Sequence, residues 1–133
     1  AASNNCLDMF NTMKICALVH KAHSWDPTIL PAQKVLDLAT IEGAKALGLE
    51  GKVGSVEIGK EADLILVDLR SPNLVPIHGR DTVISDLVYS ANGMNVDSTI
   101  VQGKPLMIHG TLSTLDEEKI MKEASEAALL LTG

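Results

Sequence analysis

The chain has 133 residues, a net charge of −6 at pH 7 and a hydrophobic content of 46%. This length and composition suit one domain with a core of ordinary size. It has only three aromatic residues, which offer no platform for stacked bases, and its negative charge disfavours contact with phosphates. We therefore expect no nucleic-acid partner.

Cysteine usage and hydropathy argue against two further classes, disulfide-stabilised and membrane-spanning proteins. Cys6 and Cys16 lie on one predicted helix and cannot specify a disulfide framework, which favours a reducing cytoplasm. We expect neither a membrane span, because the apolar runs are too short, nor a signal peptide. The first residue is not Met, and polar residues lead directly into a helix. We expect a processed, trimmed or fragmentary chain.

The first predicted elements are helices. Apolar spacings of three and four predict a helix over residues 7–21, with Asn5 as its N-cap and Asp8 in its first turn. Pro31 suits the first position of a second helix. A third, short helix is predicted through Ala44, and Gly48 is expected to end it in a left-handed conformation. The apolar positions of the first two helices are Met9, Met13, Cys16, Ala17 and His20, then Val35, Leu36 and Ala39.

The pattern changes to short strands after Gly48. Strands are predicted around Val53, Val56 and Ile58 and over residues 64–67, and a short helix over 81–89. Residues 96–102 and 106–108 should form a hairpin around Gly103-Lys104. Asp116 is expected to cap a last helix with one apolar stripe. The residues of that stripe are Ile120, Ala124, Ala127, Ala128 and Leu131.

Four histidines are the candidate metal ligands. His20 and His23 are three residues apart, but no third ligand is near them, and a histidine at a helix C-terminus is favoured by the helix dipole alone. His78 and His109 occur singly in a loop and a strand, where each could bind substrate. We favour structural or solvated roles for all four.

Two other patterns resemble a phosphate-binding loop and a catalytic carboxylate pair, but turns and strand geometry explain them better. Gly54, Gly59 and Lys60 suggest a phosphate-binding loop, but Glu61 stands where that motif needs Ser or Thr, so tight turns explain the glycines. Asp63 and Asp68 bracket a strand that would separate them by roughly 16 Å, which is too far for joint acid and base catalysis.

Several segments, in order along the chain, resemble the C-terminal part of the amidohydrolase superfamily. The branch is that of 5-methylthioadenosine/S-adenosylhomocysteine deaminases, 5-deoxyadenosine deaminases and related chlorohydrolases. Residues 1–5 look like the continuation of the family's Gly-Thr-Asp-Gly segment, and residues 51–68, here called the signature segment, resemble the family's exit from its catalytic barrel. The remaining matches are residues 26–32, 39–48, 87–91 and 96–104.

The resemblance implies an α/β fold with three parts. Residues 1–48 would be the terminal helices of a TIM-like barrel, and residues 49–115 the C-terminal part of a small β-sandwich with a short helix near 81–89. Residues 116–133 would form the final helix. In the family, histidines and an aspartate of the barrel hold a divalent metal, and all of them would lie upstream of Ala1.

The implied function is that of a cytoplasmic, metal-dependent deaminase acting on an adenosine-type nucleoside such as methylthioadenosine, S-adenosylhomocysteine or 5-deoxyadenosine. The complete enzyme would hold zinc or iron. This chain would contribute no metal ligand and no catalytic residue, and would be inactive alone. Ser3, Asn4 and Asn5 would follow the missing aspartate at the barrel mouth, where they position that loop or touch substrate.

Two alternatives remain open at the level of sequence. Within the enzyme class, the chain resembles chlorohydrolases and guanine-type deaminases with the same fold. From another class, it could be a noncatalytic structural or interaction domain. In either case, helices and strands built to pack on absent elements would expose apolar stripes and open edges. We therefore expect self-association, with elements possibly swapped between copies.

Overall fold

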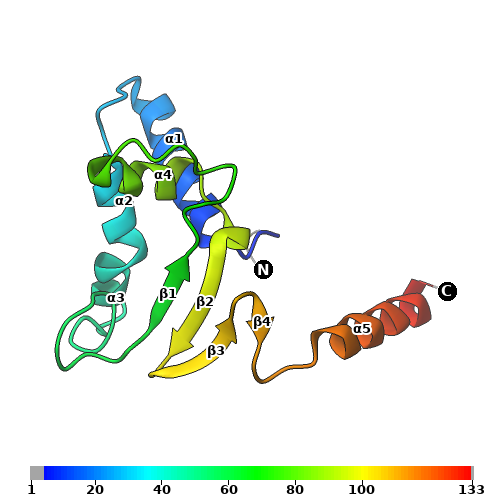
Figure 1. Cartoon of the computed structure of the whole chain (residues 1–133). Coiled ribbons are helices and arrows are strands. Elements are labelled where there is room, and N and C mark those ends of the chain that lie inside the picture. Colours follow the sequence, from blue (N-terminus) through cyan, green and yellow to red (C-terminus); the bar gives the residue numbers. More distant parts are fainter. Residues whose placement is uncertain (1–4, 133) are drawn as a thin grey trace.

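Helices pack against one end of a four-stranded antiparallel sheet, and a last helix extends away from both (Figure 1). The computed structural model describes residues 5–132. The helices are α1 (Met9–Ser24), α2 (Ala32–Ala39), α3 (Ile41–Ala46), α4 (Val83–Tyr89) and α5 (Glu117–Thr132), with 3-10 turns η1 (Arg80–Thr82) and η2 (Gly93–Asn95). The strands are β1 (Leu64–Val67), β2 (Val96–Val101), β3 (Lys104–Ile108) and β4 (Thr111–Leu112).

The N-cap of α1 is Asp8, so the prediction of Asn5 was wrong. Asp8 has an extended backbone, and its Oδ1 accepts hydrogen bonds from the amides of Phe10 at 2.9 Å and Asn11 at 3.3 Å. These are two of the donors that the first helical turn leaves unpaired. At the other end, Trp25 closes α1 in a left-handed conformation with φ of 51°.

The core lies among α1, α2 and α4 and reaches the adjacent ends of β1 and β2. Sequence spacing identified Met13, Ala17 and Val35 correctly, but Met9 and His20 are exposed, and Phe10 is buried in their place. The buried residues are Phe10, Met13, Ala17, Val35, Leu74, Val88 and Ala91, with Val67 and Val96 packed partly against them. Helical residues and the sheet thus share one core.

Two helix ends follow the sequence signals closely. Pro31 immediately precedes α2, one residue outside the predicted position. Gly48 follows the end of α3 with φ of 68°, as expected for a left-handed terminator. The predicted helix over 81–89 is present as η1 and α4.

The strands predicted around Val53, Val56 and Ile58 do not form. This part of the signature segment runs through turns and bends instead, and β1 is its only strand. Lys60, whose side chain is 12% exposed, donates to Ser55 Oγ at 2.5 Å and lies 3.1 Å from Glu57 Oε1. These contacts close a loop, and the backbone bonds within it, with the Lys60 amide donating to the Glu57 carbonyl at 3.2 Å and the Glu61 amide to the Lys52 carbonyl at 2.8 Å.

The sheet order is β1-β2-β3-β4, and β1 is an edge strand. The predicted hairpin is present, but its turn is Gln102-Gly103, one residue before the predicted Gly103-Lys104. Both turn residues have positive φ, 51° and 74°, as a two-residue hairpin of this type requires. Asp63 Oδ1 accepts the Gln102 amide at 2.7 Å and so ties the turn to the start of β1.

The last helix is capped as predicted, but its apolar stripe is not buried. The amide of Lys119 donates to Asp116 Oδ1 at 3.0 Å. Figure 1 shows α5 extending away from the rest of the chain. Leu131 is 87% exposed and Ile120 is 45% exposed. Within residues 5–132, no helix is both long and apolar enough for a membrane crossing.

Candidate functional site

The candidate residues at the N-terminus are only partly described. Ser3 and Asn4 lie outside the described residues. Asn5 is exposed, in a bend three residues before the cap of α1. The roles of Ser3, Asn4 and Asn5 in substrate binding or loop positioning therefore stay predictions.

The histidines are dispersed over the described chain. His20 and His23 lie in the last two turns of α1, exposed, and His78 is in the exposed loop before η1. Among residues 5–132, no group of three or more His, Cys, Asp or Glu side chains is placed to hold a metal ion. That this chain contributes no metal ligand stays a prediction.

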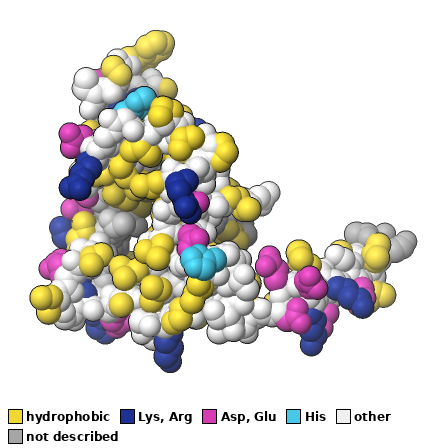
Figure 2. Space-filling model, in the orientation of Figure 1, with side chains coloured by type: hydrophobic (Ala, Val, Ile, Leu, Met, Phe, Trp, Pro, Cys, Tyr) yellow, Lys and Arg dark blue, Asp and Glu magenta, His cyan; other side chains and the backbone are white. Residues whose placement is uncertain are grey.

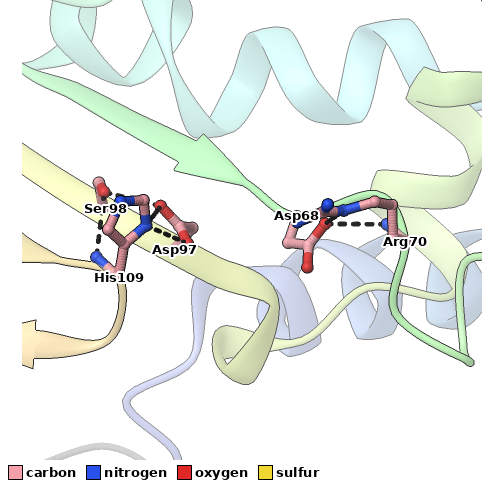
Figure 3. A network of polar contacts seen from close by, with 5 residues as sticks. All are labelled: Asp68, Arg70, Asp97, Ser98 and His109. Carbon is pink, nitrogen blue, oxygen red and sulfur yellow. Dashed lines mark hydrogen bonds and ion pairs between the residues drawn. The ribbon is translucent and has the colours of Figure 1, made fainter.

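His109 takes part in a polar cluster that sequence spacing did not reveal. Its Nδ1 lies 3.1 Å from both carboxylate oxygens of Asp97, and Ser98 Oγ donates to Asp97 Oδ2 at 2.8 Å (Figure 3). The His109 amide in turn donates to Ser98 Oγ at 3.4 Å. These contacts tie β2 to the turn between β3 and β4.

The cluster contains Asp, His and Ser but lacks the geometry of a nucleophilic triad. In such a triad the imidazole accepts the serine proton. Here the Ser98 hydroxyl donates to Asp97, so His109 does not activate it. The His109 and Ser98 contacts, in that order, lower the pKa of Asp97 and so stabilise its carboxylate form. The arrangement is structural.

Asp63 and Asp68 bind different partners at the two ends of β1. Asp63 holds the hairpin turn, whereas Asp68 Oδ1 accepts the side-chain Nε and the amide of Arg70, each at 3.0 Å (Figure 3). The Arg70 contact lowers the pKa of Asp68. The two carboxylates therefore make separate structural contacts.

One large groove on the described part of the chain is apolar. A groove of about 560 Å³ lies between α3, the loop after it and β1, and its lining includes Leu47, Val53, Val56 and Ile65. Hydrophobic side chains surround a hollow between the helices and the sheet in Figure 2. Among the described residues of its lining, Asp63 is the only titratable one. These residues offer packing surface and no acid and base pair.

The signature segment packs closely on α3 next to this groove. Gly54 has φ of 93°, and a β-carbon there would lie 2.8 Å from Ala44 Cβ and 2.9 Å from Ile41 Cα. Gly59 also has a positive φ, 96°, but its surroundings are open. Both glycines are required by backbone conformation, and Gly54 also by contact.

The sequence pattern of the amidohydrolase family matches residues 1–106. The chain belongs to the amidohydrolase family. Across 96% of its length it is 50% identical to a 5'-deoxyadenosine deaminase of Methanosarcina acetivorans. Across 95% it is 48% identical to a 5-methylthioadenosine/S-adenosylhomocysteine deaminase of Moorella thermoacetica. This amidohydrolase chain spans only 28% and 29%, respectively, of those relatives.

Solved structures agree with this placement. A zinc-bound adenosine deaminase of Xanthomonas campestris superposes with a TM-score of 0.87 at 38% identity, covering 94% of this chain and 28% of that protein. A zinc-bound atrazine chlorohydrolase of Arthrobacter aurescens superposes with a TM-score of 0.73 at 24% identity, covering 88% of this chain and 25% of that protein. The second likeness shows the amidohydrolase fold alone.

Proposed function

We propose that this chain is the C-terminal portion of a metal-dependent deaminase that hydrolyses an adenosine-type nucleoside and releases ammonia. The observation that carries the proposal is the 50% identity with a 5'-deoxyadenosine deaminase over 96% of the chain. The substrate would be 5'-deoxyadenosine, methylthioadenosine or S-adenosylhomocysteine. The zinc in a similar adenosine deaminase supports a divalent metal, zinc or iron, in the complete protein.

In this proposal the chain supports the catalytic barrel and does not hold its metal. The metal would activate water when bound, through ligands upstream of Ala1. Ser3, Asn4 and Asn5 would lie at the barrel mouth, and the helices of residues 1–48 would complete its outer layer. The sheet of residues 49–115 would join strands from the protein's N-terminus in a small β-sandwich. The apolar groove and the open edge of β1 support such packing.

The proposal is tested on two proteins: the isolated chain and the complete protein, extended upstream to its natural start. Bound metal is measured by elemental analysis, and ammonia release is followed with 5'-deoxyadenosine, methylthioadenosine and S-adenosylhomocysteine. We expect metal and deamination only in the complete protein. A complete protein that dechlorinates triazines or deaminates guanine instead would reject the nucleoside assignment. Stoichiometric metal in the isolated chain would reject the assignment of the ligands to the upstream part.

A further inference from the structure

The carboxylate of Asp8 makes contacts on both of its oxygens. Oδ1 caps α1, as described above, and Oδ2 accepts the amide of Gly93 at 2.9 Å. The two residues are 85 positions apart in the chain. Capping alone needs one acceptor oxygen, which Ser, Thr or Asn also supplies. The second oxygen links the start of α1 to the segment that enters β2, and in Figure 1 the dark blue coil just before α1 lies near the start of β2.

The Gly93 amide is itself held in place by a polar network. Asn92 Oδ1 accepts the amide of Met94 at 2.9 Å, and Asn95 Oδ1 accepts the amide of Asn92 at 2.8 Å. Asn95 is 3% exposed and is paired with Asn73 through two amide contacts, of 2.9 and 3.1 Å. This gives Asp8 a rigid anchor, because Asn95 is buried with its side-chain oxygen and nitrogen both bonded, and it holds the turn that carries the Gly93 donor.

We propose that Asp8 is a positioning residue, whose contact with Gly93 fixes the chain entering α1 relative to the body. The inference rests on the proposed function, in which residues just before α1 lie at the mouth of the catalytic barrel. Asn5 is only three residues from Asp8, so its backbone lies within about 11 Å of the anchor. A displacement of about 1 Å in a substrate-positioning segment costs up to a hundredfold in rate.

The structure supplies variants that remove the contact from either side. Asp8→Asn keeps an acceptor oxygen for the α1 amides and replaces the other oxygen by an NH2 group, which cannot accept from Gly93. Gly93→Pro removes the donor, and proline suits the first position of a helical turn such as η2. The residue before it, Asn92, is already extended, as a residue preceding proline must be.

A matched control comes from the same position. A β-carbon at Gly93 would lie 3.7 Å from Asp8 Cγ, which is ordinary contact. Gly93→Ala therefore keeps the amide donor and fits the available space. Any effect that Gly93→Pro shows and Gly93→Ala lacks belongs to the hydrogen bond or to the proline ring. The double variant Asp8→Asn with Gly93→Pro separates these two, because removing one bond twice should cost no more than removing it once.

The first measurement is amide hydrogen exchange in the complete protein, over peptides covering residues 5–13 and 90–97. We expect about tenfold faster exchange in Asp8→Asn and in Gly93→Pro, with Gly93→Ala unchanged, because a charge-assisted hydrogen bond is lost in the first two. Unchanged exchange in both of these variants would overturn the inference. This readout does not depend on the protein being active.

The second measurement is steady-state deamination of 5'-deoxyadenosine by folded variants of matched metal content. We expect kcat to fall about tenfold or more in Asp8→Asn and Gly93→Pro, KM to change less, and the double variant to match the singles. A lower melting temperature with unchanged kcat would mean a structural contact only and would overturn the positioning role. A wild-type protein that deaminates no nucleoside would instead reject the proposed function. If the variants of that protein still exchange faster, Asp8 remains the anchor of α1.

Discussion

At Gly54 the signature segment touches the helix before it, and this contact has a measurable cost. Gly54→Ala would place a β-carbon 2.8 Å from Ala44 Cβ at a φ of 93°. We expect the free energy of unfolding to fall by about 3 kcal/mol, from backbone strain together with overpacking. Gly59→Ala is the control, since its φ of 96° is similar but its surroundings are open. It should cost only about 1 kcal/mol. Urea unfolding measures both, and equal losses would refute the packing contribution.

The Asp97 cluster predicts a pH-dependent contribution to stability. The His109 and Ser98 contacts lower the pKa of Asp97 from its ordinary value of 3.8, so the folded state favours the carboxylate. This stability is present above pH 3.8 and is lost as pH falls through the lower folded pKa. Asp97→Asn should therefore melt below the wild type near neutral pH, and the gap should close in acid.

Thermal melts of the wild type and Asp97→Asn across this range test the sign of the effect. Asp68→Asn is a useful comparison, because the Arg70 contact also lowers the pKa of Asp68. Figure 3 shows this pair apart from the Asp97 cluster. Asp68→Asn should remove its own share of the acid dependence and slightly increase that of Asp97, because the Asp68 charge raises the pKa of Asp97. A gap for Asp97→Asn that widened in acid would contradict the assignment.

Among the elements, the β2–β3 hairpin carries a turn residue that its conformation disfavours. Gln102 has φ of 51°, and a left-handed backbone suits Asn better than Gln. We expect Gln102→Asn to raise the free energy of unfolding by about 0.5 kcal/mol, as an Asn-Gly turn replaces Gln-Gly, offset in part by loss of the contact with Glu61. Gly103→Ala, at φ of 74° in open space, should instead destabilise by about 1 kcal/mol. Chemical denaturation that gave both variants the same sign would contradict the turn assignment.

Local signals predicted the elements wherever local interactions decide them. Pro31, Gly48 and Asp116 act within one turn of their own positions, and the chain uses each near its predicted place. Around Val53 and Ile58, β-branched and aliphatic residues favoured strands, but the Lys60 contacts with Ser55 and Glu57 and the packing of Gly54 hold a loop. Side-chain contacts of this kind override weak strand propensity.

The candidate site was less predictable, because its contacts are distant in sequence. The sequence predicts Asp8 as an acid of the first turn, whereas it caps α1 and also accepts the Gly93 amide. No spacing rule joins positions 85 residues apart. His109 was placed in a strand, yet it stands in the turn after β3 with φ of 48° and contacts Asp97. The separation of Asp63 from Asp68 was predictable, since strand geometry alone fixes it.

At the scale of the whole molecule, the exposed apolar surfaces predict self-association of the isolated chain. The groove beside α3 is open, β1 is an edge strand, and Ile65 on β1 lines the groove and is 50% exposed. Apolar grooves and edge strands associate with other chains when no part of their own chain covers them. We therefore expect a mass that rises above 14.1 kDa with concentration in sedimentation or light-scattering experiments.

The chain offers a matched pair of variants for this prediction. Ile65 is in register with Thr99, which is in register with Met107, so these three lie on one face of the sheet. Ile108 follows Met107 and lies on the opposite face, with a similar exposure of 45%. Ile65→Lys should weaken association about tenfold or more, because a charge then enters the apolar contact, whereas Ile108→Lys should change it less. A wild-type chain that stays at monomer mass at all concentrations and melts cooperatively would refute the prediction. Equal effects of Ile65→Lys and Ile108→Lys would show that the groove is not the contact surface.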